Sequence, residues 1–143
     1  MPEVFAVYKI VFKINNKTKE TPALETVSDI ESLGLDIGNG IEEWSPIDQE
    51  GWVRKMATAK NFVLAVSGKR SVGDSGNDYV AGMAFKLGSD VATDYSIEFP
   101  DGSTTTGNCI IEVTNVGDGA STNIGQLVWN LHSDGKPTYT PGA

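Results

Sequence analysis

The sequence is poor in the residues that carry most metal and redox chemistry. Its 143 residues include one cysteine, Cys109, and one histidine, His132. A single cysteine excludes an intramolecular disulfide framework and any zinc or iron–sulfur site built from several cysteines. A single histidine excludes His-rich metal sites and catalysis that needs two imidazoles. We therefore expect no metal, no cofactor and no enzymatic activity.

Neither of these two residues has the surroundings typical of catalysis. Cys109 lies in an apolar alternating run with no basic neighbour in sequence to lower the pKa of its thiol, which favours a buried structural role. His132 continues the alternation of residues 127–131, which favours an ordinary solvent-facing strand position. Residues 67–73 are glycine-spaced and basic but lack the frame of a phosphate-binding loop.

Long hydrophobic runs are absent as well. No apolar stretch approaches the roughly 18 residues of a membrane-spanning helix. The first residues, Met1-Pro2-Glu3, lack the basic start and apolar stretch of a signal peptide, and Lys9 and Lys13 interrupt the apolar residues that follow. We expect no signal peptide and a reducing, intracellular compartment. The chain length suits one domain covering residues 1–143.

Basic residues are scarce in the second half of the chain. The sequence has 19 acidic and 11 basic residues, for a formal net charge of −8. Residues 71–143 hold nine acids and only two bases, Lys86 and Lys136, whereas residues 1–70 hold ten acids and nine bases. A general affinity for nucleic acid needs Lys and Arg to neutralise phosphates. The composition therefore argues against tight binding of nucleic acid, above all through the second half.

A hydrophobic period of two dominates the residues that are present. Such alternation is typical of strands with one face in the core and one in water. The alternating or apolar runs are residues 8–14, 32–37, 41–44, 62–67, 95–99, 109–113 and 127–131. The Asn-Gly step in Gly38-Asn39-Gly40 favours a tight hairpin turn at that point. The pattern predicts a mainly β fold, an antiparallel β-sandwich or barrel of about seven strands.

One segment has a helical pattern. Its apolar stripe, at i, i+3, i+4 and i+7, consists of Val80, Met83, Ala84 and Leu87. We expect one short flanking α-helix over about residues 77–87, capped by Ser75 or Asn77. Residues 136–143 contain two prolines and are expected to form an extended or disordered C-terminal arm.

Large apolar side chains also occur in a polar, proline-containing segment. Among polar residues and glycine, this segment contains Trp44, Pro46, Ile47 and Trp52. Exposed aromatic residues on a loop often mark an interface. A loop that folds back over its own core explains the same pattern equally well.

Five of the eleven basic residues lie within a short stretch just after that segment. They are Arg54, Lys55, Lys60, Lys69 and Arg70. In a strongly acidic protein, such a cluster can dock against an acidic patch on another copy. Simple solvation of these charges is an equal alternative.

Four blocks of the sequence resemble the major tail tube proteins of long-tailed bacteriophages. In chain order they are Glu50-Gly51-Trp52-Val53-Arg54-Lys55, Ser67-Gly68-Lys69-Arg70 with Gly73-Asp74-Ser75-Gly76-Asn77-Asp78-Tyr79-Val80-Ala81-Gly82, Tyr95-Ser96-Ile97-Glu98-Phe99-Pro100-Asp101-Gly102, and Val113-Thr114-Asn115-Val116-Gly117 with Ser133-Asp134-Gly135-Lys136-Pro137. They span about residues 44–137. The order of the blocks and the chain length carry the resemblance, and the first 40 residues agree only in strand pattern.

The resemblance implies a structural protein. Subunits of this family form hexameric rings that stack into a hollow tube, and DNA passes through it during ejection. A long loop, here about residues 38–58, reaches the next ring. The implied partners are further copies of the chain, the tape measure protein, and the tail terminator and baseplate proteins. The implied location is the tail tube of a virion, assembled in the host cytoplasm. Tubes of type VI secretion and of phage-tail-like bacteriocins share the architecture.

The resemblance also suggests roles for individual residues. The expected contacts between subunits or rings are Trp44, Pro46, Ile47, Trp52, Arg54, Lys55, Lys69 and Arg70. Glu98 and Glu112, polar positions of alternating strands, are the candidates for the lumen. An acidic wall repels phosphates, so that a duplex slides without a deep binding minimum.

A monomeric binding module is the alternative reading of the same sequence. An immunoglobulin-like or carbohydrate-binding domain of a phage or cell-surface structure would also consist of alternating strands. In that case Trp44 and Trp52 would stack on sugars. The state of the purified protein, monomer or assembly, separates the two readings.

Overall fold

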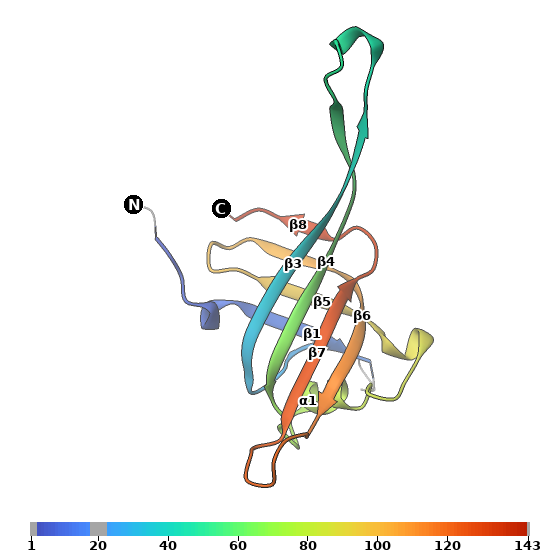
Figure 1. The fold of residues 1–143 in the computed structure, drawn as a ribbon. Coiled ribbons are helices and arrows are strands. Elements are labelled where there is room, and N and C mark those ends of the chain that lie inside the picture. Colours follow the sequence, from blue (N-terminus) through green and yellow to red (C-terminus); the bar gives the residue numbers. More distant parts are fainter. Residues whose placement is uncertain (1–2, 18–22, 143) are drawn as a thin grey trace.

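The computed structural model describes residues 3–17 and 23–142. This part of the chain contains eight strands, one α-helix and three short 3-10 helices (Figure 1). The strands are β1 Val11–Asn16, β2 Ala23–Thr26, β3 Ile30–Trp44, β4 Arg54–Lys69, β5 Ala92–Glu98, β6 Thr104–Val116, β7 Gln126–Ser133 and β8 Thr138–Thr140. The α-helix α1 is Ser75–Ala81, and the 3-10 helices are Val7–Lys9, Ile47–Gln49 and Gly88–Val91.

The strands form one antiparallel sheet that folds over into two layers. Its order is β2-β1-β5-β6-β7-β4-β3, and β8 pairs with the start of β6. The long strand β6 belongs to both layers, because its first half pairs with β5 and its second half pairs with β7. Aromatic pairs join the layers: the ring centroids of Phe12 and Trp129 lie 5.7 Å apart, and those of Phe62 and Tyr95 lie 5.4 Å apart. The predicted antiparallel sandwich is confirmed.

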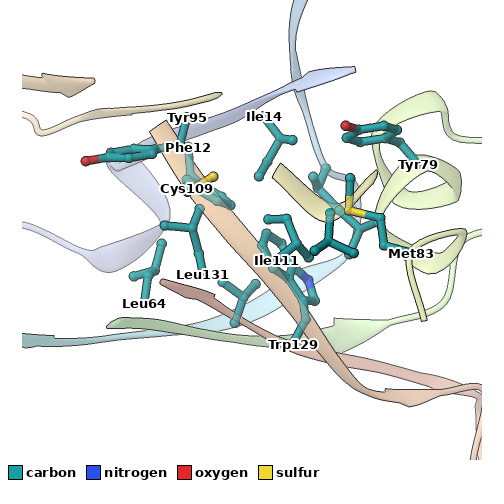
Figure 2. Close-up of a cluster of buried hydrophobic side chains, with 14 of the residues drawn as sticks. Phe12, Ile14, Leu64, Tyr79, Met83, Tyr95, Cys109, Ile111, Trp129 and Leu131 are labelled. Carbon is teal, nitrogen blue, oxygen red and sulfur yellow. The ribbon is translucent and has the colours of Figure 1, made fainter. Parts of the chain in front are cut away.

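The core lies between the two layers and is closed at one end by α1 (Figure 2). Alternation places Leu127, Trp129 and Leu131 of β7 on its floor, all of them buried. Tyr79, Val80 and Met83 add the contribution of the helical region. Because a fully buried aromatic or aliphatic side chain contributes roughly 1.5–3 kcal/mol, these alternating runs dominate the stability of the fold. No helix in the described ranges is long and apolar enough to span a membrane.

The helix is shorter than predicted and has a different cap. It runs over Ser75–Ala81 rather than residues 77–87, and the residue at its N-cap is Asp74, not Ser75 or Asn77. The chain turns at Gly82, whose helix propensity is about 1 kcal/mol worse than that of alanine. Leu87, which the apolar stripe placed in the core, is therefore exposed.

The predicted turn at Gly38-Asn39-Gly40 is wrong. β3 continues straight through it, and Asn39 pairs with Lys60 of β4 across the ladder. Cross-strand pairing with a long partner thus outweighs the local preference of Asn-Gly for a turn. A bulge occurs between Gly40 and Ile41, and the hairpin then projects away from the sandwich as an arm, residues 41–57, at the top of Figure 1. The loop expected over residues 38–58 is therefore mostly strand, and only residues 45–53, the tip loop, connect β3 to β4.

The C-terminal segment is extended, as predicted, and part of it is a strand. Residues 138–140 form β8, which pairs with Thr104–Thr106 of β6. β8 lies at the end of the sandwich from which the arm projects (Figure 1).

Candidate assembly surfaces

The tip loop and the last residue of β3, Trp44, present large apolar side chains to solvent. Ile47 is fully exposed, Trp52 is 76% exposed and Trp44 is 41% exposed. Pro46 precedes the short 3-10 helix, and left-handed backbone at Glu50 and Gly51 then turns the chain back towards β4. The alternative of a loop folded back over the core is therefore wrong. The fold holds these side chains at the far end of a two-stranded ribbon, away from the core (Figure 1).

The two cations at the start of β4 are occupied within the arm. The Arg54 guanidinium lies 5.3 Å from the centre of a Trp44 ring, in cation–π geometry. The Lys55 ammonium lies 3.1 Å from a Glu43 carboxylate oxygen. Both pairs join residues directly opposite each other in the β3–β4 ladder. These pairs stiffen the end of the ribbon. The side chains of Trp52 and Ile47 remain exposed to solvent.

Lys69 and Arg70 do not join Arg54 and Lys55 in one patch. Arg54 begins the 16-residue strand β4 and Lys69 ends it, which places the two pairs about 50 Å apart along the extended chain. Lys69 forms an ion pair with Glu31 at 3.2 Å, and Arg70 forms one with Asp78 at 2.8 Å. The basic cluster expected from the sequence is therefore split between the two ends of the molecule.

The glycine-rich block 73–78 is a structural lock rather than a ligand site. Asp74 caps α1 by accepting a hydrogen bond from the backbone amide of Asn77 at 3.0 Å. Its carboxylate also accepts hydrogen bonds from the backbone amide and the hydroxyl of Ser28. Desolvation raises the pKa of Asp74, but these hydrogen bonds outweigh it, and the pKa is lowered overall. A Cβ atom at Gly76 would collide with the Thr26 carbonyl, so only glycine allows this close approach.

Asn77 is the centre of this lock. It is fully buried, and its amide group donates to the carbonyl oxygens of Ser28 and Lys69, both at 3.0 Å. Its carbonyl oxygen accepts from the Ser71 amide at 3.0 Å and from Arg70 at 2.9 Å. One side chain therefore holds the β2–β3 turn, the end of β4 and the helix together.

One surface of the sandwich carries two carboxylates and a single cation, Lys69, at its lower end. It is the outer face of β3, β4, β7 and the second half of β6, opposite the buried Phe62, Leu64 and Val66. Alternation and register assign to this outer face Ser32, Gly34, Asp36, Gly38, Asn61, Val63, Ala65, Ser67, Lys69, Gln126, Val128, Asn130, His132, Ile110, Glu112 and Asn115. Its carboxylates are Asp36 and Glu112, and its one cation, Lys69, forms an ion pair with Glu31 at the end of β4.

Glu112 is held in place by β7. Asn130 donates a hydrogen bond to Glu112 Oε1 at 3.0 Å, and His132 Nε2 lies 3.1 Å from the same oxygen. The hydrogen bond from Asn130, followed by the one with His132, lowers the pKa of Glu112. This carboxylate therefore stays ionised well into the acidic range. His132 faces outwards, as predicted.

Glu98 and Glu112 do not lie on the same surface. Glu98 ends β5, opposite Val11 of β1 and Thr104 of β6, on the outer face of the other layer. That face also carries Lys13, which pairs with Ser96. Because the layers pack core side to core side, their outer faces point in opposite directions. A single wall can include one of the two candidates but not both.

The layer formed by β3, β4, β7 and the second half of β6 has two open edges within the described residues. β3 pairs with β4 on one side, and no strand pairs with its other edge over Ile30–Trp44. β6 pairs with β5 only as far as Ile110, so the same edge lacks a strand partner from Ile111 to Val116. Long open edges promote strand pairing with other chains.

An apolar groove of about 980 Å³ opens at the base of the arm. Leu35 and Ile37 of β3 line it, and both remain about half exposed. Ile97, Phe99 and Tyr139 form much of the rest of its wall.

Further exposed apolar side chains lie away from the tip. Phe85 and Leu87 are exposed between α1 and β5, and Val4, Phe5 and Tyr8 are exposed in the N-terminal segment. The sequence does not mark any of these residues as a contact site. Their hydrophobicity is the only feature that could indicate one, and core residues share it.

Cys109 is buried in the core, as predicted. Desolvation, together with the charge of Asp94, raises the pKa of its thiol to about 12. The thiolate, which is the reactive form of cysteine, is therefore negligible at neutral pH. The residue acts as a small apolar side chain between the layers (Figure 2).

Solved structures of tail and injection-system assemblies contain chains with the same fold. A chain of the tail of an empty GTA particle, obtained with helical refinement and C6 symmetry, has a TM-score of 0.73 at 12% identity, covering 96% of this chain and 99% of that one. A chain of the anti-feeding prophage cap, a tube-terminating cap, has a TM-score of 0.64 at 17% identity, with coverage of 99% and 94%.

A chain of the PVC sheath–tube complex, from an extracellular contractile injection system in the extended state, has a TM-score of 0.60 at 14% identity, with coverage of 96% and 92%. No protein-family model matches the chain, and no curated protein sequence does either. The fold is therefore the one found in these tail and tube assemblies.

Proposed function

We propose that this chain is a structural, non-enzymatic subunit of a tail tube, which forms hexameric rings that stack into a hollow conduit. Its fold is shared with chains from a GTA tail and from contractile injection systems. The observation that carries the proposal is the open edge of β3, which runs for 15 residues. An edge of this length in a monomer is an aggregation hazard, whereas a closed ring removes it.

Strand directions allow the ring to close by regular pairing. The order β6-β7-β4-β3 is antiparallel at each step, so β3 runs antiparallel to β6 of the same copy. Rotation about a tube axis preserves these directions. The open edge of β3 then meets the open edge Ile111–Val116 of β6 in the next copy with antiparallel polarity. Four strands from each copy form one continuous wall.

The outer face defined above becomes the inner surface of that wall. It carries Asp36 and Glu112 from each copy, and its one cation, Lys69, lies at the lower end of β4 in an ion pair with Glu31. We propose that DNA passes this surface without binding, because the fixed carboxylates repel phosphates and the charge of Lys69 is compensated by Glu31. Glu112 remains a lumen candidate, Asp36 joins it, and Glu98 lies on the outside of the tube.

The two ends of the subunit are suited to head-to-tail stacking. The tip loop carries the exposed Trp52 and Ile47 together with two carboxylates, Asp48 and Glu50. At the opposite end, Lys69 and Arg70 are paired with Glu31 and Asp78. We propose that the arm of one ring contacts the lower end of the next, so that the exposed apolar surface of the tip loop is buried. The tube would end at terminator and baseplate proteins, enclose a tape measure protein during assembly in the host cytoplasm, and belong to a virion tail.

The assembly state of the purified protein tests this function directly. We expect concentrated protein to form rings or tubes in negative-stain micrographs and to elute early in size exclusion. Because many such subunits need a nucleating baseplate, short tube fragments from purified particles serve as seeds. A chain that stays monomeric at high concentration with seeds present would support the monomeric binding module instead. Trp44 and Trp52 would then be its ligand contacts.

Charge reversal on the inner surface tests the proposed lumen. In particles built from the Asp36→Lys, Glu112→Lys variant, we expect normal tubes but DNA ejection slowed by about tenfold or more, because each ring gains cations that attract phosphate. Glu98→Lys is the matched control on the other outer face and should leave the rate unchanged. Ejection in real time measures both. Slowing by Glu98→Lys alone would reverse the assignment of the inner surface.

A further inference from the structure

The groove at the base of the arm is basic as well as apolar. Its lining includes Lys60 and Lys136, and no Asp or Glu lies among the residues that form it. Such a composition stands out in a chain with 19 acids and 11 bases. Lys136 is one of only two cations in residues 71–143. Neither lysine forms an ion pair in the described structure, and the Lys60 ammonium donates to Asn39 Oδ1 at 2.8 Å.

We propose that this groove binds the N-terminal segment, residues 3–8, of a neighbouring copy in the same ring. The proposal rests on the tail tube function given above and adds a second lateral contact beside the strand edges. The segment Glu3-Val4-Phe5-Ala6-Val7-Tyr8 is the occupant. It combines apolar side chains with one carboxylate, which complements a groove that combines apolar walls with two ammonium groups.

The N-terminal segment is largely exposed, although Val7 and Tyr8 border a small cavity beside Ile30–Leu33 of β3. Val4 is almost fully exposed, Tyr8 is 85% exposed, and Phe5 and Val7 are about half exposed. The recorded backbone hydrogen bonds of this segment are those of the 3-10 turn, from Lys9 to Ala6 and from Ile10 to Val7. Apolar side chains held in water gain roughly 25 cal/mol for each Å² that a partner covers. The groove walls Leu35, Ile37 and Tyr139 are themselves about half exposed and gain in the same way.

The position of the segment suits a neighbour in the ring rather than its own groove. In Figure 1 the N-terminal segment, from residue 3 on and drawn in blue, leaves the sandwich on the β3 side and rises towards the level of β8. β8 and the segment before it contribute Lys136, Pro137 and Tyr139 to the groove. A copy placed beside the open edge of β3 has its own groove at that same level. The tip loop of another ring is a poorer occupant, because it lies at the far end of the arm.

Cysteine cross-linking in assembled tubes tests the contact. The double variant Val4→Cys, Tyr139→Cys is treated with a short bis-maleimide and analysed on a denaturing gel. The native Cys109 is fully buried and stays unreactive. We expect a ladder that ends at the hexamer, since contacts around a closed ring join at most six chains. The matched control Phe85→Cys, Tyr139→Cys should give no ladder, because Phe85 is exposed elsewhere.

Other outcomes of this experiment overturn the proposal. Tubes that form but give only monomers would show that the segment does not reach a neighbour. A ladder beyond the hexamer would place the contact between rings. Both leave the tail tube function standing. If wild-type chains form no rings or tubes with seeds present, the proposed function fails, and this inference fails with it.

A charge swap gives a second, quantitative test. We expect Lys136→Glu and Glu3→Lys each to raise the critical concentration for tube growth by about fivefold, which corresponds to loss of an interfacial ion pair worth about 1 kcal/mol. Combining them should restore the wild-type value to within about twofold. The matched control is Lys86→Glu, the same change elsewhere on the chain. Adding Glu3→Lys to it should not lower the critical concentration for tube growth. Absence of rescue in the Glu3–Lys136 pair would overturn the role of charge.

Discussion

Replacing Trp52 with alanine is expected to abolish tube growth while leaving a folded monomer. The side chain is largely exposed at the tip loop and has no part in the core. Truncation of a large aromatic anchor at the centre of an interface costs about 2–4 kcal/mol per copy. A ring repeats that loss in every copy, so polymerisation should fail at any practical concentration. Negative-stain microscopy scores tubes, and circular dichroism scores folding.

The other two tryptophans provide a second test and a control. Trp44→Ala should also block growth, and the monomer should lose only the contact of Arg54 with the ring. Trp129 is fully buried between the layers, so Trp129→Ala should unfold the domain with a loss of about 3–5 kcal/mol. Tubes of normal length from both Trp44→Ala and Trp52→Ala would refute the role of the tip.

Replacing Asn77 with alanine is expected to lower the free energy of unfolding by about 3 kcal/mol or more. The change leaves the carbonyl groups of Ser28 and Lys69 and the amide of Ser71 without their partner. An orphaned polar group in a buried site costs about 1–3 kcal/mol. Urea unfolding of the monomer measures the effect as a shift in midpoint at constant slope.

The matched control for Asn77 is Asn130, which also donates a side-chain hydrogen bond but on the outer face. Asn130→Ala should change the free energy of unfolding by less than about 0.5 kcal/mol, because its partner Glu112 remains solvated. If both alanine variants unfold at the same urea concentration as the wild type, the block 73–78 is not the lock described here.

Much of the fold was predictable because burial imposes a period of two. The runs around Phe12 and Ile14, and around Leu127 and Trp129, alternate strictly and lie in the core as expected. At Gly38-Asn39-Gly40 the local preference of Asn-Gly predicts a turn, whereas pairing with β4 keeps these residues in a strand. Register against β4 decides the conformation there, and no local pattern reveals it.

The candidate surfaces were less predictable than the core. Arg54 and Lys69 are close in sequence but far apart in space, because an extended strand separates them by most of the length of the molecule. Phe85 and Leu35 have the sequence character of core residues, and only the tertiary structure shows them exposed. The tip residues stand out in the sequence as large apolar side chains in a polar segment, and the structure shows that they are exposed; their contacts with other subunits stay a prediction.

The length of the arm and the orientation of its side chains are coupled. From Ile41 opposite Ala57 to Trp44 opposite Arg54 it is a plain two-stranded ladder beyond the bulge. Removing one residue from each strand would shorten its reach by about 3.4 Å and turn Trp44 to the opposite face. Removing two from each would shorten it by about 7 Å and keep every side chain on its face. The arm can therefore change length during evolution only in steps of two residues per strand if its contacts are to survive.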